Sequence, residues 1–576
     1  MFGNILNDSI LKRIAGAAQD GMRTARFGFN ILAANIGLQY LTPLRRRLAL
    51  TAAACAFLAF LPALGGGFLN FDDDKNLIEN AYFEKGFSEP SWMFKPDPFG
   101  LTIPLTWASL SLDRLLWGQR PFGYHLQNLL WHALATALLY FLALALIRGR
   151  EEEGPAERLG ALAAALFFGL HPLRVESVAW ITERRDSLSL TFLLLSTLAY
   201  LRHGAGTPRA YAASLCAYAL SLAAKPIGMG QPFLLLALDR YFLDRKAFKE
   251  KLPFLFLSIL AGALVYQGIR GAEKTAILEP FNPLQHASYC AYGLVYYLRK
   301  TLVPCALSPL HPNPPHLNPL EPHFLASGAA AVLLLAAFWK WRRHRGVWTA
   351  GLQYLLGVAP VLGLARNGPQ LVADRYSYLS CLGWAVLAGA ALSSVLRRVP
   401  ESARPVLLKR ARLGLCALAF GFIFLSWDYC GVWKDSRSLW SHVLRLYPDS
   451  HTAHNNLGVV DMKDSRLKEA ERHFRAALSA QASDWTAASN LGSALLLQGR
   501  AAEALEPYRT ALAFKPGHAP TRSNYGAALL QTGDMDGAVR EFSEALRLKP
   551  DWVTAQKNLE SARELRKRGG AVRLGL

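Results

Sequence analysis

Long apolar stretches separated by short polar segments fill the first three quarters of the chain. Eleven of these stretches approach the ~20 residues that an α-helix needs to cross a bilayer. They lie at 48–66, 124–147, 159–178, 187–202, 209–225, 227–243, 252–269, 323–341, 346–365, 379–396 and 413–430. Two more, 101–117 and 286–302, also carry charges, and we expect interfacial or re-entrant helices there. The pattern predicts an all-α, polytopic membrane domain over residues 48–430.

Basic residues gather in the segments that lie on one side if the chain alternates sides at each span. Such segments are Arg148–Arg158, Arg240–Lys251, Lys340–Arg345 and Arg397–Arg412, together with a basic arm over residues 1–47. Cytoplasmic loops carry this excess. We therefore expect the N-terminus in the cytoplasm, an uncleaved first span, and residues after about 430 outside, which is the periplasm in a bacterium.

The composition agrees with a membrane protein and removes other classes. Hydrophobic residues make up 52% of the chain and charged residues 18%, with a mean hydropathy of +0.16. The net charge is +21, and residues 1–430 hold 42 Lys and Arg against 26 Asp and Glu. Because this excess lies in the apolar part, we expect loop charges and no nucleic-acid partner. The seven cysteines form no C-x-x-C pair, so no zinc or redox site is predicted.

A repeat of 34 residues starts near residue 450. Small or aromatic side chains recur at this step in four columns: Gly458, Gly492 and Gly526; Ala470, Ala504 and Ala538; Phe474, Tyr508 and Phe542; Ala477, Ala511 and Ala545. This is the tetratricopeptide pattern, in which small residues let two helices approach and an aromatic residue packs between hairpins. We predict an α-solenoid over 431–568, with repeats at 451–484, 485–518 and 519–552, flanking half-repeats and a tail at 569–576.

Such a solenoid presents a concave groove that suits a polypeptide. Asn456, Asn490 and Asn524 recur in its predicted first helices and are candidates for binding an acceptor polypeptide. The alternative is that these asparagines only form hydrogen bonds between helices.

Three adjacent carboxylates, Asp72, Asp73 and Asp74, follow the first span in a predicted outer loop at 67–123. One of them can take a proton from a hydroxyl, and a second can raise the pKa of the first. Asp72 and Asp74 are also candidates for binding a divalent metal such as Mg²⁺ or Mn²⁺. The alternative is that they cap a helix.

Further ionisable residues lie at the outer ends of the predicted spans. Arg184 and its neighbouring arginines can grip a phosphate, because the guanidinium fork matches phosphate oxygens. Lys225 and Asp374-Arg375 lie between apolar stretches, where an ionisable residue is functional by default. The alternative for the arginines is contact with lipid headgroups. His125 and His132 share one face of the second span, where bonding between helices is the competing explanation.

These residues occur in motifs that resemble one known family. The motifs are Phe71-Asp72-Asp73-Asp74, Tyr124-His125-Leu126-x-Asn128-x-x-x-His132, His171-Pro172-x-x-x-Glu176, Arg184-x-Asp186, Lys225-Pro226 and Ala373-Asp374-Arg375-x-x-Tyr378. With the repeats, they resemble the transmembrane and tetratricopeptide-repeat O-mannosyltransferases and their bacterial relatives, over residues from about 48 to 566. The family's Arg-Pro is Ile103-Pro104 here, and its Glu-Arg is Asp374-Arg375.

The resemblance implies a glycosyltransferase of the GT-C superfamily that uses a polyprenyl-phosphate sugar, mannose-like, as donor. Asp72, Asp73 or Asp74 would then be catalytic, and Arg184, Arg375, Lys225 and His171 would bind the donor phosphate. The supporting polar residues would be His125, His132, Glu176, Asp186, Asp374 and Tyr378. Competing hypotheses are a membrane-anchored scaffold without catalysis, a glycan ligase or polymerase with the same donor, and a transporter.

Overall fold

The computed structural model describes residues 42–97, 100–149, 153–204, 207–272, 282–314, 317–362 and 370–567. The basic arm expected at 1–47 lies outside the described residues except for 42–47, and the tail at 569–576 lies wholly outside. The chain forms two compact units. The membrane unit holds the residues up to 68, 72–307 and 313–434, and the repeat unit holds Leu69–Phe71, Ser308–Pro312 and the residues from Asp435.

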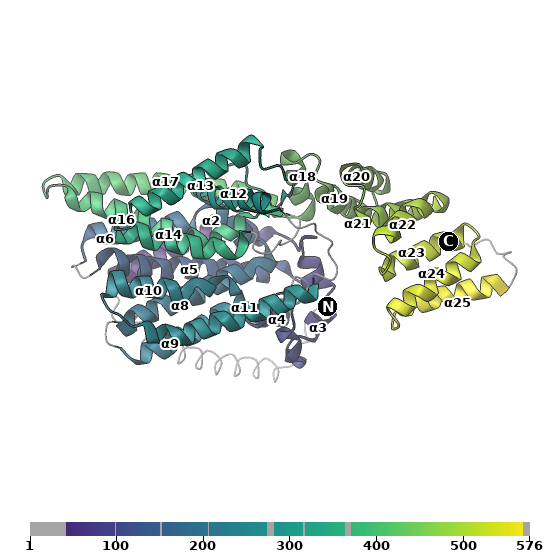
Figure 1. Ribbon diagram of the computed structural model, residues 1–576, viewed down its shortest axis with the longest axis horizontal. Helices are drawn as coiled ribbons and strands as arrows, with labels where there is room; N and C mark the ends of the chain where they lie inside the picture. The colour runs from purple at the N-terminus through teal and green to yellow at the C-terminus, as the bar shows by residue number, and fades with distance from the viewer. Residues whose placement is uncertain are drawn as a thin grey trace, which may run out of the picture. The chain divides into compact units, whose positions relative to one another are not determined.

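The membrane unit is a bundle of helices, with α11 and α17 on opposite outer sides (Figure 1). Its helices are α2 (Pro43–Ala59), α3 (Ala81–Lys85), α4 (Pro104–Trp117), α5 (Pro121–Arg148), α6 (Pro155–Gly169), α7 (Val175–Ala179), α8 (Arg184–Gly204), α9 (Arg209–Ala224), α10 (Gln231–Leu238), α11 (Leu252–Ala272), α12 (Pro283–Leu302), α13 (Pro322–Lys340), α14 (Arg345–Val358), α15 (Ser377–Ser380), α16 (Leu382–Arg398) and α17 (Arg404–Val432). Two short strands also occur in the described chain, β1 (His311–Pro312) and β2 (Gln370–Val372).

Each apolar stretch of the sequence contains a helix, so the all-α prediction is confirmed. In the described residues, 4 helices are long and apolar enough to cross a membrane: Pro121–Arg148, Phe248–Arg270, Pro322–Lys340 and Arg404–Val432. The number rises to 6 if two bent pairs, Pro155–Gly169 with Pro172–Ala179 and Asp374–Ser380 with Leu382–Arg398, are each one span. Several other stretches contain shorter helices, and the count of eleven spans stays a prediction.

Helices α6 and α16 belong to the two bent pairs and pack directly on each other. A Cβ added to Gly160 would lie 2.5 Å from the main-chain oxygen of Gly389, so the two backbones touch. Small residues allow such close packing between membrane helices. Beyond these helices the chain bends, by 53° after α6 and by 56° before α16. Both bends carry residues of the candidate site.

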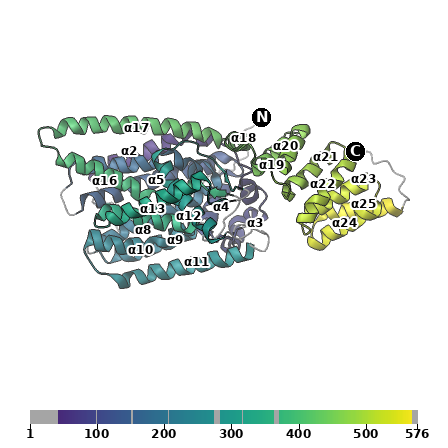
Figure 2. The same cartoon turned by 45° about the horizontal axis from the view of Figure 1, so that its top comes forward.

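The repeat unit is a stack of helical hairpins (Figure 2). Its helices are α18 (Ser436–Leu446), α19 (His451–Lys463), α20 (Leu467–Ala480), α21 (Trp485–Leu497), α22 (Ala501–Phe514), α23 (Ala519–Gln531), α24 (Met535–Leu548) and α25 (Val553–Lys567). The 34-residue period is visible in the packing. Added Cβ atoms at Gly458, Gly492 and Gly526 would lie 2.7, 2.8 and 3.1 Å from the aromatic rings of Phe474, Tyr508 and Phe542. The predicted tetratricopeptide solenoid is confirmed.

Candidate functional site

The three adjacent aspartates have different surroundings. Asp73 is fully buried, and its Oδ1 accepts hydrogen bonds from the main-chain N (3.0 Å) and Oγ1 (2.6 Å) of Thr182. Thr182 lies in the turn Ile181–Glu183, just before α8. Asp73 therefore ties the acidic loop to this turn, and its engaged oxygen is a poor proton acceptor for a substrate.

Asp72 is half-buried and has a left-handed backbone, with φ of 70°. Aspartate tolerates this conformation better than most residues. Among the described residues, no hydrogen bond to its carboxylate is formed. Burial raises the pKa of Asp72, although the charges of Arg185, Lys75 and Arg375 oppose the rise. Asp72 is thus an unengaged carboxylate within electrostatic range of two guanidinium groups.

Asp74 is half-buried, and its Oδ1 accepts a hydrogen bond from the main-chain N of Lys75 at 2.9 Å. In the part of the chain that the structure describes, no three His, Cys, Asp or Glu side chains form a group that could hold a metal ion. The predicted metal ligands Asp72 and Asp74 are therefore two carboxylates without a third such side chain in the described residues. Mg²⁺ is often bound by one or two carboxylates, with phosphate oxygens and water completing its shell.

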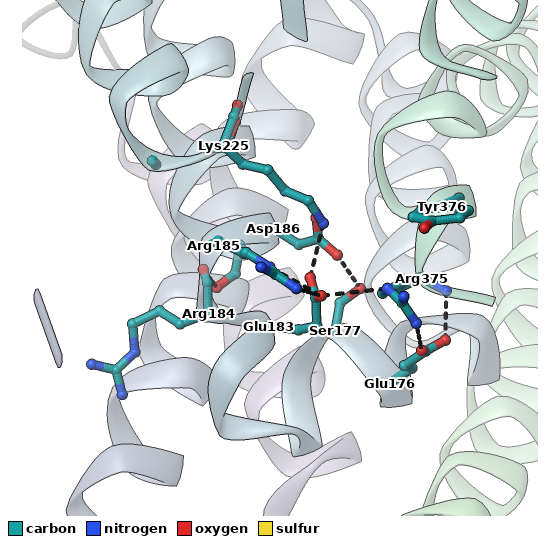
Figure 3. A network of polar contacts seen from close by, with 12 residues as sticks. Glu176, Ser177, Glu183, Arg184, Arg185, Asp186, Lys225, Arg375 and Tyr376 are labelled. Carbon is teal, nitrogen blue, oxygen red and sulfur yellow. Dashed lines mark hydrogen bonds and ion pairs between the residues drawn. The ribbon is translucent and has the colours of Figure 1, made fainter. Parts of the chain in front are cut away.

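A buried network of ion pairs lies beside this loop (Figure 3). Arg375, which follows β2, forms an ion pair with Glu176 of α7 at 2.5 Å, and its main-chain N donates to the other Glu176 oxygen at 2.7 Å. The Arg375 guanidinium also lies 5.4 Å from the ring centroid of Trp180. These contacts join the two bends of the membrane unit and hold the Arg375 side chain in one place.

Glu183 is the centre of the network, because three cations share its carboxylate. Arg185 approaches at 2.5 Å, Lys225 at 2.8 Å and Arg375 at 3.3 Å. Burial alone would raise the pKa of Glu183, but the charges of Arg185, Lys225 and Arg375 outweigh it and hold the pKa well below its usual value. Glu183 therefore stays ionised and fixes the three cations next to one another.

Lys225 and Asp186 extend the network. The Lys225 ammonium lies 2.6 Å from Asp186 Oδ1, and Ser177 Oγ donates to the other Asp186 oxygen at 2.8 Å. Lys225 stands at the C-terminal end of α9 and Asp186 in the first turn of α8. The network thus unites residues from α7, α8, α9 and the segment after β2.

Arg184, a predicted phosphate ligand, lies elsewhere and points away from the network in Figure 3. It is fully buried and forms an ion pair with Asp113 of α4. Its Nε donates to Asn128 Oδ1 and its Nη2 to the main-chain oxygen of Tyr124, each at 2.7 Å. These contacts hold α4, α5 and α8 together and keep Arg184 apart from the network.

Two of the three predicted histidines, His132 and His171, bond to protein groups. His132 contacts the Tyr378 hydroxyl at 2.7 Å and the Gly169 carbonyl at 2.9 Å, and His171 contacts the Thr301 carbonyl at 3.0 Å. His125 is buried, with its ring close to Gly66. The structure does not bring these rings into the network.

Asp374 sits beside Arg375 in the chain but faces a different partner. It is fully buried and accepts a hydrogen bond from the Tyr296 hydroxyl at 2.5 Å. Of the predicted site residues in the membrane unit, the structure therefore joins Glu176, Asp186, Lys225 and Arg375 in one network, with Asp72 in its electrostatic range.

Three members of the network were not among the predicted site residues: Glu183, Arg185 and Ser177. The signal for Glu183 and Arg185 was the run of four charged residues at 183–186 beside an apolar stretch, because ionisable residues at membrane depth are functional by default. Arg184 and Arg185 share that signal. A helix turns about 100° per residue, so the two side chains leave α8 in different directions, and only Arg185 faces Glu183.

In the repeat unit, two of the three candidate groove asparagines bond to a neighbouring helix. Asn490 Nδ2 donates to Asn455 Oδ1 at 2.9 Å, and Asn524 Nδ2 donates to Ser493 Oγ at 3.3 Å. Asn456 Nδ2 donates to the main-chain oxygen of Thr452 at 2.9 Å, within its own helix. Bonding between helices therefore accounts for the NH₂ groups of Asn490 and Asn524, while each Oδ1 keeps its acceptor capacity.

Comparisons with known proteins agree with both halves of this description. Residues 461–519 and 495–563 match two family models described as tetratricopeptide repeat. The chain is 21% identical over 454 residues to protein O-mannosyl-transferase F38B6.6 of Caenorhabditis elegans, covering 74% of this chain and 62% of that protein. It is 22% identical over 481 residues to human protein O-mannosyl-transferase TMTC4, covering 71% and 63%.

A shorter match is closer in sequence. Over 178 residues the chain is 33% identical to protein O-mannosyl-transferase Tmtc2 of Drosophila melanogaster, covering 28% of this chain and 18% of that protein. The chain thus spans between 18% and 63% of the length of these three relatives. By sequence the chain is similar to these protein O-mannosyl-transferases, and its C-terminal part matches the tetratricopeptide repeat.

Proposed function

We propose that this protein is an integral-membrane glycosyltransferase. It moves a mannose-like sugar from a polyprenyl-phosphate donor to a hydroxyl group of an acceptor protein, at the outer face of the membrane. The observation that carries the proposal is Asp72, a half-buried carboxylate without a hydrogen-bond partner among the described residues, in electrostatic range of Arg185 and Arg375. The N-terminus is then cytoplasmic and the repeats are outside, in the periplasm of a bacterium.

Asp72 is the general base in this mechanism. The acceptor oxygen attacks the anomeric carbon, its proton passes to the Asp72 carboxylate, and the bond from the anomeric carbon to the phosphate oxygen breaks. The phosphate leaves with the electron pair. Burial supports this role because a raised pKa makes a carboxylate a stronger base near neutral pH. Asp73, whose Oδ1 accepts two hydrogen bonds from Thr182, holds the loop in position.

Arg185 and Arg375 stabilise the leaving phosphate. Glu183 and Glu176 fix both guanidinium groups before any substrate arrives. Fixed charges of this kind act where negative charge develops, and removing one well-placed donor costs about 10²- to 10³-fold in kcat. Lys225 adds a third positive charge, and its ion pairs with Glu183 and Asp186 hold it in place.

A divalent metal, Mg²⁺ or Mn²⁺, would be held by Asp72 and Asp74 together with oxygens of the donor phosphate. When bound, it would neutralise part of the phosphate charge. Asp74→Asn would then raise the metal concentration needed for the half-maximal rate more than it lowers the rate at saturating metal. A rate that is the same in chelator and in added metal contradicts this part of the proposal.

The repeats capture the acceptor polypeptide and raise its effective concentration near the catalytic loop. Asn456, Asn490 and Asn524 each keep an amide oxygen that can accept a hydrogen bond from an extended chain. This arrangement explains why a binding module and a membrane catalyst share one polypeptide.

The test is transfer of radiolabelled sugar from membrane lipid-linked donors to protein, with the full chain in native membranes. We expect Asp72→Asn to lower transfer by about 10²- to 10⁴-fold, the usual contribution of a general base. Asn suits the left-handed backbone at this position, so the fold is retained. Glu79→Gln is the matched control, because Glu79 is an exposed carboxylate of the same loop.

Equal transfer by Asp72→Asn and Glu79→Gln would remove Asp72 from the mechanism. No transfer by the wild-type protein across a panel of donors would reject the glycosyltransferase. If the repeats still bound polypeptides in that case, the protein would be a membrane-anchored scaffold.

A further inference from the structure

A pocket of about 460 Å³ opens in the repeat unit, at the junction of its first two complete repeats. Its walls come from α20 and from the turn between α21 and α22, and α20 packs against α21 (Figure 2). Four of its lining residues are cations, and the full lining is Lys468, Glu469, Glu471, Arg472, Arg475, Gln498 and Arg500. The candidate groove asparagines do not line it, so the pocket is separate from the predicted groove.

Glu471 is the buried member of this lining, at 6% exposure. Its Oε2 accepts hydrogen bonds from Gln498 Nε2 at 3.0 Å and from Arg500 Nη1 at 2.7 Å. Its Oε1 forms an ion pair with Arg475. One carboxylate therefore ties the two repeats together and holds two of the four cations in place.

The other two cations have little protein charge to bind. Arg472 pairs with Glu469 at 3.5 Å, and its side chain is 77% exposed. Among the described residues, Lys468 forms no ion pair. Glu503 flanks the pocket and adds a third carboxylate. Four cations against three carboxylates leave a surplus of positive charge, carried by exposed side chains with free donors.

The next repeat does not keep these cations. A step of 34 residues from Lys468, Arg472, Arg475 and Arg500 leads to Ala502, Glu506, Arg509 and Asp534. One cation then stands against two carboxylates. The glycine, alanine and aromatic columns that pack the helices recur at the same step. The packing of a repeat therefore does not require the four cations, and they are a particular feature of the first junction.

We propose that this pocket binds an acidic polypeptide segment. Lys468, Arg472 and Arg475 follow one face of α20 at the spacing i, i+4 and i+7, which covers about 10 Å along the helix. An extended chain covers that length in about three residues. A row of separate cations suits several carboxylates in sequence, whereas one phosphate needs donors that converge on a point.

The absence of apolar side chains from the lining favours a polypeptide over a lipid layer. Membrane surfaces hold proteins through inserted apolar residues together with charge, and the lining residues are all polar or charged. The inference concerns the repeat unit alone and does not depend on the proposed sugar transfer.

The test is binding of a fluorescent oligoglutamate peptide of about six residues, long enough to cross the row. Fluorescence anisotropy is measured with the full chain in neutral detergent. The test variant combines Lys468→Ala with Arg472→Ala. The matched control combines Arg540→Ala with Lys557→Ala, which removes two exposed cations from α24 and α25 of the same unit. Both variants have the same net charge.

We expect the test variant to weaken peptide binding by about three- to twentyfold, because an exposed charge pair contributes up to about a fivefold factor. The control should stay within about twofold of wild type. Arg472→Lys keeps the charge and should retain most of the binding. Salt should weaken wild-type binding more than that of the test variant, because screening acts on the removed charges.

Four results would overturn the inference. Equal weakening in the test variant and the control would mean that the peptide senses only the net charge. Weaker binding in Asn490→Ala, with unchanged binding in the test variant, would place the peptide in the predicted groove. Displacement by inorganic phosphate as effective as by unlabelled oligoglutamate would make the pocket a site for a single anion. Absence of binding by the wild-type protein would reject the pocket as a site for acidic polypeptides.

Discussion

Removing the charge of Glu183 is the most direct test of the buried network. Glu183 is fully buried and holds Arg185, Lys225 and Arg375 at 2.5 to 3.3 Å. In Glu183→Gln, the three cations keep Glu176, Asp186 and Asp97, of which Asp97 lies 3.7 Å from Arg185. Among the described residues, Arg185 then has only this longer contact with a carboxylate in a region closed to water.

The expected loss follows from the number of pairs. Two unit charges about 4 Å apart interact by roughly 4 kcal/mol at an effective dielectric constant of about 20, so three pairs give a gross attraction of about 12 kcal/mol. The cost of burying Glu183 offsets most of this. Removal of one partner from a buried ion pair measures about 3–5 kcal/mol, and we expect a loss of stability in this range.

The assay is thermal denaturation of the full-length protein in detergent. The measured quantity is the fraction of protein that stays monodisperse after heating to each temperature. Glu183→Gln should lower the apparent midpoint by roughly 5 °C or more, while the exposed control Glu79→Gln should not change it. A second variant tests the cause. Glu183→Gln combined with Lys225→Met removes one of the three cations that lose this carboxylate, and should recover part of the loss.

Two results would refute this reasoning. The first is a midpoint for Glu183→Gln equal to that of the control, which would mean that the three cations do not depend on Glu183. The second is a double variant that is no more stable than the single one, which would mean that the loss comes from packing and not from unpaired charge.

Three further predictions follow from single contacts. Gly492→Ala places a Cβ 2.8 Å from the Tyr508 ring and should destabilise the repeats by about 1–3 kcal/mol in chemical denaturation, whereas Gly517→Ala, which meets no atom within 4 Å, should not. The acid limb of kcat in the wild type should lie above pH ~4, the pKa of free aspartate, because burial raises the pKa of Asp72. Activity is lost as the pH falls through the raised pKa of Asp72. A limb at or below pH ~4 would contradict the assignment of Asp72 as the base. Asp113→Asn leaves its buried arginine partner without a counter-charge and should lower stability by about 3–5 kcal/mol, with a normal midpoint arguing against that pair.

The helices and the repeat were predictable because their signals are periodic and local. Each apolar stretch contains a helix, and the 34-residue columns placed the glycines opposite the aromatic rings. The number of spans was not predictable in the same way. A hydropathy run does not show where a helix breaks, and the bends of 53° and 56° lie inside stretches that the sequence presents as continuous or adjacent.

The candidate site was predictable in composition but not in detail. Sequence placed Glu176, Asp186, Lys225 and Arg375 near one membrane surface, and the structure joins them. Sequence could not choose Arg185 over Arg184. Both residues are buried in the first turn of α8, so a hydropathy pattern does not show which side of the helix each side chain leaves from. Nor could it separate Asp72 from Asp73, since their difference comes from backbone direction and from the distant Thr182.

The close packing of α6 on α16 limits how the membrane unit can move. Gly160 and Gly389 place the two backbones in contact, and the chain beyond each helix carries one half of the Glu176–Arg375 ion pair. Sliding these helices past each other would force main-chain atoms into overlap, so the pair behaves as a fixed frame. Any motion that opens the ion pair has to occur at the two bends, and the joints of this protein are therefore the residues next to Leu170 and Cys381.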